Sequence, residues 1–145
     1  MSLAGADGPV DREELLKTRE AMSARGPDGA GVWFSDDGQI GLASRRLAIL
    51  DLSPAGAQPM ASDDGTIQLI MNGEIYNFRQ LRAKLEAAGY RFHGGSDTEV
   101  VLALYQRHGD AFLSLLRGMF GLAIWDSSKR RLLLARDTLG IKPLY

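Results

Sequence analysis

The chain has 145 residues, of which 45% are hydrophobic and 24% charged, a composition typical of a soluble globular protein with a single core. Lysine and arginine total 17 against 18 aspartates and glutamates, so the net charge of -1 gives no electrostatic reason to expect nucleic acid or an anionic membrane as partner. The lack of cysteine excludes disulfides, thiolate metal sites and a cysteine nucleophile in these residues, and the two histidines alone make a zinc site unexpected.

The first half of the chain predicts a helix followed by a hairpin. Asp11 and Glu14 have the spacing of a capping box, which predicts a helix over residues 11–24 that ends before Gly26 and Pro27. Two short strands over residues 32–34 and 39–45 then surround a turn, and the loop over residues 51–65 is the longest in the chain. No apolar run reaches membrane-spanning length and no signal peptide is evident, so we expect a cytoplasmic protein.

The central stretch, residues 66–88, predicts a strand, a junction and a helix in quick succession. Apolar residues alternate up to Met71, and after Asn77 they recur at helical spacing, with Asn77 as the expected cap. Between these elements lies Asn72-Gly73-Glu74, for which two interpretations are open. Asn-Gly is a common turn dipeptide. Alternatively, the Asn72 amide and the Gly73 N–H stand together as two donors that would stabilise an oxyanion.

The last third predicts a short strand over residues 90–93, a helix that Ser96 and Glu99 begin as a capping box, and a short helix over residues 110–116. Two apolar runs, residues 119–125 and 132–135, predict a second hairpin of buried strands. Because strands in hairpins do not alternate strictly with the helices, the pattern favours an α+β fold with antiparallel sheets.

Several polar side chains at element boundaries suggest binding chemistry. Considered singly, each side chain has an ordinary interpretation: Arg46 as a solvated arginine, Glu74 as an exposed acid and Asp97 as an acid in the first turn of a helix. Taken together, they suit a free amino acid: a guanidinium binds a carboxylate through two hydrogen bonds, and carboxylates bind an ammonium. Asn72 and Gly73 would then polarise a side-chain carbonyl.

At these residues the sequence resembles the glutaminase domain of glutamine-hydrolysing asparagine synthetases, which are class II glutamine amidotransferases. The resemblance covers nearly the whole chain in the family's order and is specific because many blocks match together. The matching blocks are RGPDG (25–29), RRLAILDLS (45–53), GAQP (56–59), NGEIYN (72–77), SDTE (96–99), RGMF (117–120), ARD (135–137) and LGIKPLY (139–145).

The resemblance implies an N-terminal-nucleophile hydrolase fold, an αββα sandwich of two antiparallel sheets. It implies that Arg46 binds the α-carboxylate of glutamine and that Glu74 and Asp97 meet its α-ammonium. Asn72 and Gly73 would form the oxyanion hole. The remaining implied lining residues are Leu47, Ala48, Ile49 and Leu50.

The resemblance also implies one type 2 glutamine amidotransferase domain over residues 1–145, truncated at its C-terminal end. L-glutamine and a C-terminal synthetase domain of the same polypeptide would be its partners. The domain itself needs no cofactor, whereas the absent synthetase domain would use ATP and magnesium to convert aspartate to asparagine. The sequence leaves the oligomeric state undecided, with a homodimer open.

The sequence departs from the family in two places. The family begins Met-Cys-Gly, whereas here Met1-Ser2-Leu3 precede Ala4-Gly5. Two explanations are open: Ser2 replaces the cysteine nucleophile, or a leader has replaced the native start. Ser44 stands where the family usually has histidine. We therefore expect glutamine binding without hydrolysis by this chain. Two other readings stay open, namely an amidotransferase with another carboxylate acceptor and a non-catalytic binding domain.

Overall fold

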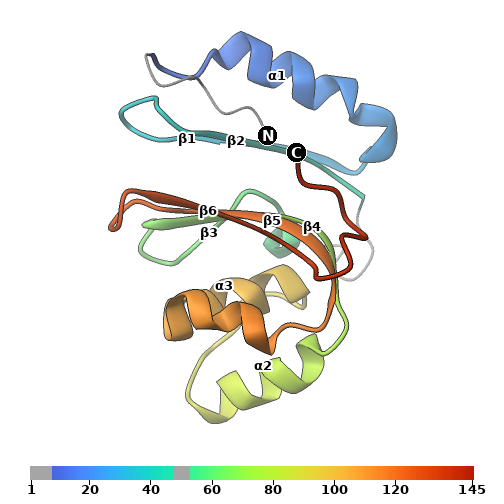
Figure 1. The fold of residues 1–145 in the computed structure, drawn as a ribbon, viewed down its shortest axis with the longest axis vertical. Helices are drawn as coiled ribbons and strands as arrows, with labels where there is room; N and C mark the ends of the chain where they lie inside the picture. Colours follow the sequence, from blue (N-terminus) through green and yellow to red (C-terminus); the bar gives the residue numbers. More distant parts are fainter. Residues whose placement is uncertain (1–7, 48–52) are drawn as a thin grey trace. The chain divides into compact units, whose positions relative to one another are not determined.

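The computed structural model describes residues 8–47 and 53–145, which form two compact units. The first unit contains the described residues up to 47 together with Ala57–Pro59. The second contains residues 53–56 together with Met60–Tyr145. Each unit has its own antiparallel sheet, as the sequence predicts (Figure 1).

The first unit is a helix packed on a two-stranded sheet. Helix α1 (Arg12–Ala21) begins where Asp11 accepts a hydrogen bond from the Glu14 N–H, 3.0 Å away, and a 3₁₀ turn, η1 (Ser23–Arg25), follows it. Strands β1 (Gly29–Phe34) and β2 (Gly41–Arg46) pair in register from Gly29 opposite Arg46 to Phe34 opposite Gly41. Leu15 of α1 is buried, and a Cβ on Gly41 would lie only 2.7 Å from it, so this glycine lets the helix approach the sheet closely.

The second unit is built on a four-stranded antiparallel sheet in the order β3-β4-β5-β6. Its longest ladder joins β4 (Ile67–Ile75) and β5 (Gly118–Asp126), running from Ile67 opposite Asp126 to Ile75 opposite Gly118. Strand β3 (Met60–Ala61) pairs with only two residues of β4, and β6 (Arg131–Arg136) forms the other edge. A 3₁₀ turn, η2 (Pro54–Gly56), precedes β3.

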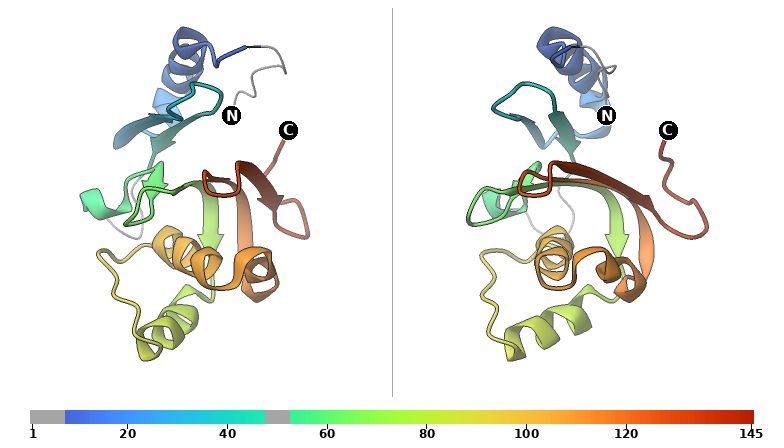
Figure 2. Two further views of the ribbon diagram at one scale, coloured as in Figure 1. Left: turned by 90° about the vertical axis from the view of Figure 1, so that its left-hand side faces the viewer. Right: turned by 60° about the vertical axis from the view of Figure 1, so that its left-hand side comes forward.

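Helices cover one face of this sheet, as Figures 1 and 2 show. The hydrophobic core lies between that face and α3 (Asp97–His108), while α2 (Phe78–Ala87) packs on α3 from outside. Strand alternation explains the division: odd-numbered residues of β4 enter the core, so even-numbered ones lie on the opposite face. The 3₁₀ segment η3 (Gly109–Leu115) follows α3 and buries Phe112.

Two local predictions are confirmed and two are wrong. Ser96 caps α3 by accepting from the Glu99 N–H, and Gly109 ends that helix with a φ of 54°. Asn77, however, makes no capping hydrogen bond, because its side chain instead binds the Leu115 carbonyl and the Arg117 N–H. Residues 90–93 are not a strand, since Glu99 takes up the N–H groups of residues 93 and 94 that a strand partner would need.

The prediction that the central strand ends before Asn72 is also wrong. Strand β4 continues through Asn72-Gly73-Glu74 to Ile75, with every residue paired to β5. The partner strand therefore overrides the local turn preference of Asn-Gly. No helix within residues 8–47 and 53–145 is long and apolar enough to cross a membrane.

Candidate active site

The distal end of β4 comes unusually close to the backbone of β5. Gly73 has a φ of 149°, and a Cβ there would lie 2.0 Å from the Met119 carbonyl oxygen. Gly118 makes the reciprocal approach, since its Cβ would lie 2.1 Å from the Glu74 carbonyl oxygen. Only glycine satisfies both the dihedral and the space at position 73. The glycine of the NGE motif is therefore required by the sheet itself.

In the β4–β5 ladder only every second residue of β4 exchanges backbone hydrogen bonds with β5. Gly73 is not one of these residues, so its N–H points away from β5. The Tyr76 N–H donates to the Arg117 carbonyl and the Ser127 N–H to the Thr66 carbonyl, so even-numbered residues of β4 exchange bonds with β5. Odd-numbered N–H groups point to the other edge, where β3 pairs only with Gln68 and Leu69. The Gly73 amide thus shares an edge with the Ile75 amide, beyond the reach of β3.

Asp97 closes that edge. Its Oδ2 accepts a hydrogen bond from the Ile75 N–H at 2.8 Å, although the two residues are 22 positions apart. Asp97 is the first residue of α3, which Ser96 caps, and it is only 6% exposed. Its bond to Ile75 places the start of the helix next to the end of β4. A buried carboxylate therefore lies next to the edge that carries the Gly73 amide.

Glu74 and Asp97 lie at the corner of the second unit where β4 ends beside the start of α3. The surroundings there disfavour the ionised form of both acids. Burial raises the pKa of Asp97, and the hydrogen bond from Ile75 offsets this only in part. Burial also raises the pKa of Glu74, with the negative charge of Asp97 as the second cause, while Lys142 acts in the opposite direction. A half-buried acid whose ionisation is disfavoured by a neighbouring buried carboxylate forms with it an arrangement suited to a cationic ligand.

Asn72 lies on the face of the sheet opposite the core, where its side chain is exposed. Glu74 is the next residue on that face and is half-buried. Lys142 was not predicted as a site residue. It reaches this region from the C-terminal segment, which sequence spacing does not reveal because the segment is 68 positions from Glu74.

In the first unit, the two arginines of the RR pair point to opposite faces of the β1–β2 sheet. Arg45 lies on the α1 side, where its Nη1 is 3.7 Å from Glu20 Oε2. Arg46 lies on the other face, as does Ser44, whose Oγ donates a 2.6 Å hydrogen bond to the Gln58 carbonyl. Ser44 therefore ties the GAQP block to the strand that carries Arg46.

The predicted site residues fall into three groups. Asn72, Gly73, Glu74 and Asp97 gather at one corner of the second unit. Arg46 and the exposed Leu47 belong to the first unit, and their convergence on that corner stays a prediction. The other predicted lining residues, Ala48, Ile49 and Leu50, lie outside the described residues. Among the described residues, no group of three or more acids or histidines is placed to hold a metal ion.

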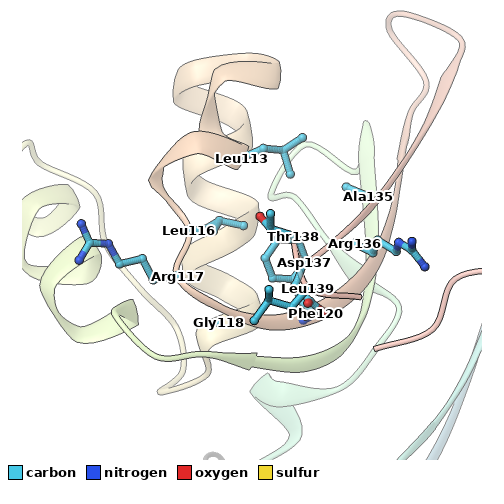
Figure 3. Close-up of a pocket in the computed structure, with 10 residues that line it drawn as sticks. All are labelled: Leu113, Leu116, Arg117, Gly118, Phe120, Ala135, Arg136, Asp137, Thr138 and Leu139. Carbon is cyan, nitrogen blue, oxygen red and sulfur yellow. Dashed lines mark hydrogen bonds between the residues drawn. The ribbon is translucent and has the colours of Figure 1, made fainter. Parts of the chain in front are cut away.

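A separate pocket of about 280 Å³ lies in the second unit and contains none of these residues. Figure 3 shows its mixed lining: Leu113 lies in η3, Leu116 directly follows that segment and Phe120 lies in β5. Polar groups come from Arg117, Arg136, Asp137 and Thr138. The Arg117 and Arg136 guanidinium groups point outward on opposite sides (Figure 3). The Asp137 carboxylate, which also lines the pocket, already accepts hydrogen bonds from three backbone N–H groups.

Comparisons with known proteins identify the family. A family model described as a glutamine amidotransferase domain matches residues 2–145. The chain is 48% identical to asparagine synthetase [glutamine-hydrolyzing] 1 of Bacillus subtilis, with 94% of this chain and 21% of the relative covered. It is 45% identical to amidase chry2 of Gibberella zeae, with 92% of this chain and 20% of the relative covered.

Among solved structures, the glutamine phosphoribosylpyrophosphate amidotransferase of B. subtilis matches with a TM-score of 0.79 at 23% identity, covering 94% of this chain and 37% of that one. This likeness shows the fold, which agrees with the N-terminal-nucleophile hydrolase fold that the family resemblance implies. The chain spans about a fifth of the length of the two curated relatives. It belongs to the glutamine amidotransferase domain family and is homologous to the glutaminase domains of asparagine synthetases.

Proposed function

We propose that this chain binds L-glutamine at the corner formed by β4 and the start of α3. Glu74 and Asp97 would bind the α-ammonium, and the guanidinium of Arg46 would bind the α-carboxylate. One observation carries the proposal: Glu74 and Asp97, whose pKa values are both raised, lie near the Gly73 N–H, which points away from β5. An ammonium ligand relieves the repulsion between the two acids, which is a direct source of binding free energy.

The Gly73 N–H and the Asn72 side-chain amide are the proposed donors to the side-chain carbonyl of glutamine. A donor that is fixed by a sheet needs no reorganisation when it meets a developing negative charge. The tight Gly73–Met119 approach supplies this rigidity. Because the 145 residues include no cysteine, we propose binding without hydrolysis. Ammonia release from glutamine by the purified chain, with Ser2 as nucleophile, would overturn this part.

For the parent protein we propose glutamine hydrolysis coupled to ATP-dependent synthesis of asparagine from aspartate, with ATP and magnesium held by a synthetase domain. Relatives named as asparagine synthetases support this acceptor. The amidase relatives, at 42–45% identity, favour a second candidate, an amidotransferase with another carboxylate acceptor. Incubation of the full-length protein with glutamine, ATP and aspartate tests it, since asparagine formation supports the first candidate and its absence the second.

Ligand analogues test the amino-acid site directly. Glutaramic acid is glutamine without the ammonium, and 4-aminobutanamide is glutamine without the α-carboxylate. Calorimetric titration of the chain should rank L-glutamine as the tightest of the three, since only it can use both Arg46 and the two acids. Loss of one charge-assisted contact should weaken binding by about tenfold or more.

Two variants assign each contact. Asp97→Asn should reduce the preference for glutamine over glutaramic acid, and Arg46→Met should reduce the preference for glutamine over 4-aminobutanamide. Arg45→Met is the matched control, because Arg45 lies on the α1 side of its strand. The proposal fails if Asp97→Asn binds glutamine as tightly as the unmodified chain, or if the control weakens binding as much as Arg46→Met.

A further inference from the structure

Lys142 reaches the candidate site through a sharp reversal of the chain after β6. The Gly140 N–H donates to the Asp137 carbonyl at 3.0 Å, and Gly140 has a φ of 65°, so the chain turns back over the sheet. Lys142 and Pro143 then cross Gly121, where an added Cβ would lie 3.8 Å from the Lys142 Cβ. Gly121 pairs with Asn72, and Glu74 follows two residues later on the same face. Lys142 is thereby placed beside the acidic corner.

The buried carboxylate of Asp137 fixes this crossing. It accepts hydrogen bonds from the N–H groups of Phe120, Ile141 and Lys142 at 3.1, 2.9 and 3.0 Å. The bond from the Lys142 N–H is the first cause of the lowered pKa of Asp137, so the carboxylate stays ionised in this role. Only the backbone of Lys142 is used, which leaves its half-buried side chain to act on its surroundings.

We propose that Lys142 is a specificity-determining residue that makes the acidic corner select a zwitterionic amino acid over a simple amine. This inference rests on the proposed function, in which Glu74 and Asp97 bind an α-ammonium. Without Lys142, two neighbouring carboxylates would attract any cation. With Lys142 beside Glu74, the ammonium of a simple amine is partly repelled. An amino acid also has an α-carboxylate, which Lys142 attracts, and this attraction offsets the repulsion of its ammonium.

The charge of Lys142 also acts on Glu74. The positive charge of Lys142 lowers the pKa of Glu74 against the larger raising effects of burial and of Asp97. The side chain therefore acts on the carboxylate that the proposed function assigns to the ligand.

The test compares Lys142→Met with Lys142→Arg, which keeps the charge. Both variants should fold, since Asp137 binds only the backbone N–H of residue 142. At low salt, Lys142→Met should bind 4-aminobutanamide about three- to tenfold more tightly and glutaramic acid about threefold more weakly, and high salt should reduce both effects. Lys142→Arg should behave like the unmodified chain. Equal shifts for the two analogues, or no shift, would overturn the inference.

A second measurement separates this inference from the proposed function. The Glu74 carboxyl can be titrated by NMR without ligand, and Lys142→Met should raise its pKa while Lys142→Arg should not. If that shift is seen but the unmodified chain binds no glutamine, the proposed function fails and the specificity role fails with it. If glutamine binds and Lys142→Met leaves both the Glu74 pKa and the analogue ratio unchanged, only the role of Lys142 is overturned.

Discussion

The two ends of the β4–β5 ladder carry buried acids in opposite electrostatic conditions. At one end, Asp126 is 2% exposed and accepts hydrogen bonds from Tyr105 Oη at 2.8 Å, Ser128 Oγ at 2.6 Å and the Lys129 N–H at 3.1 Å. The Lys129 ammonium also lies 2.9 Å from it. At the other end, buried Asp97 accepts one hydrogen bond from outside its own helix turn, from Ile75, and Glu74 lies near it with the same sign of charge.

The difference separates an acid whose charge the protein itself satisfies from the acid that we propose as a ligand contact. Burial alone would raise the pKa of Asp126, but hydrogen bonds from Ser128, Lys129 and Tyr105 outweigh it and hold the pKa well below its usual range. At Asp97 burial dominates and the pKa is raised. The charge at the Asp126 end is thus satisfied within the protein, whereas the ionised acids at the other end would be stabilised by a bound cation.

The largest expected loss of stability follows from a substitution at Gly73, at the end of the β4–β5 ladder that carries the candidate site. Gly73→Ala should destabilise the chain by about 3–5 kcal/mol, because its Cβ would meet the Met119 carbonyl and its φ of 149° is strained for alanine. Gly65→Ala is the control: Gly65 also has a positive φ of 72°, but nothing lies within 4 Å of its Cβ position, so only about 1 kcal/mol is expected. Urea unfolding measures both. Equal losses would contradict a special close approach at Gly73.

Much of the secondary structure was predictable because its signals are local. Asp11 and Ser96 both cap the helices that their spacing predicts, and continuous apolar runs locate β5 and β6. Residues whose role depends on a distant partner were not predictable in the same way. Asn77 has the sequence of a cap, but the Leu115 carbonyl and the Arg117 N–H, about 40 positions away, capture its side chain.

In the candidate site, too, the roles that depend on neighbouring residues were predictable, and those that depend on distant partners were not. Gly73 was identified as special, but its turn interpretation failed because β5 pairs across the whole NGE motif. The acidic pair of Glu74 and Asp97 was predicted by what an amino-acid ligand requires and by family resemblance. Lys142 was missed because only the reversal at Gly140, fixed by Asp137, brings it to the site.

The next effect compares the same substitution at the two ends of the ladder. Asp126→Asn should lower the free energy of unfolding by about 2–4 kcal/mol, because it removes a charge that three side chains and a backbone N–H are arranged to meet. Asp97→Asn should leave it unchanged or raise it by about 1 kcal/mol or less, since the amide oxygen can still accept from Ile75 and the repulsion with Glu74 disappears. Destabilisation of similar size by both would abolish the distinction between the two ends.

The smallest effect is in the pH dependence of stability, and its sign differs between the ends. Because the pKa of Asp126 is lowered on folding, its contribution is present above the ordinary carboxyl value of 3.8 and is lost as the pH falls toward the folded value. Because the pKa of Asp97 and that of Glu74 are raised, their contribution is greatest when they are protonated and is lost as the pH rises through the folded values.

Urea unfolding across the acidic to neutral range should therefore show two changes in slope. Asp126→Asn should flatten the loss of stability at the acidic end, and Asp97→Asn should flatten the decline toward neutral pH. Saturating L-glutamine should also remove that decline in the unmodified chain, because its ammonium stabilises the ionised acids, and glutaramic acid should not. If glutaramic acid removes the decline as well as glutamine does, the acids at the Gly73 end are not the ammonium site, and the contrast with Asp126 reflects burial alone.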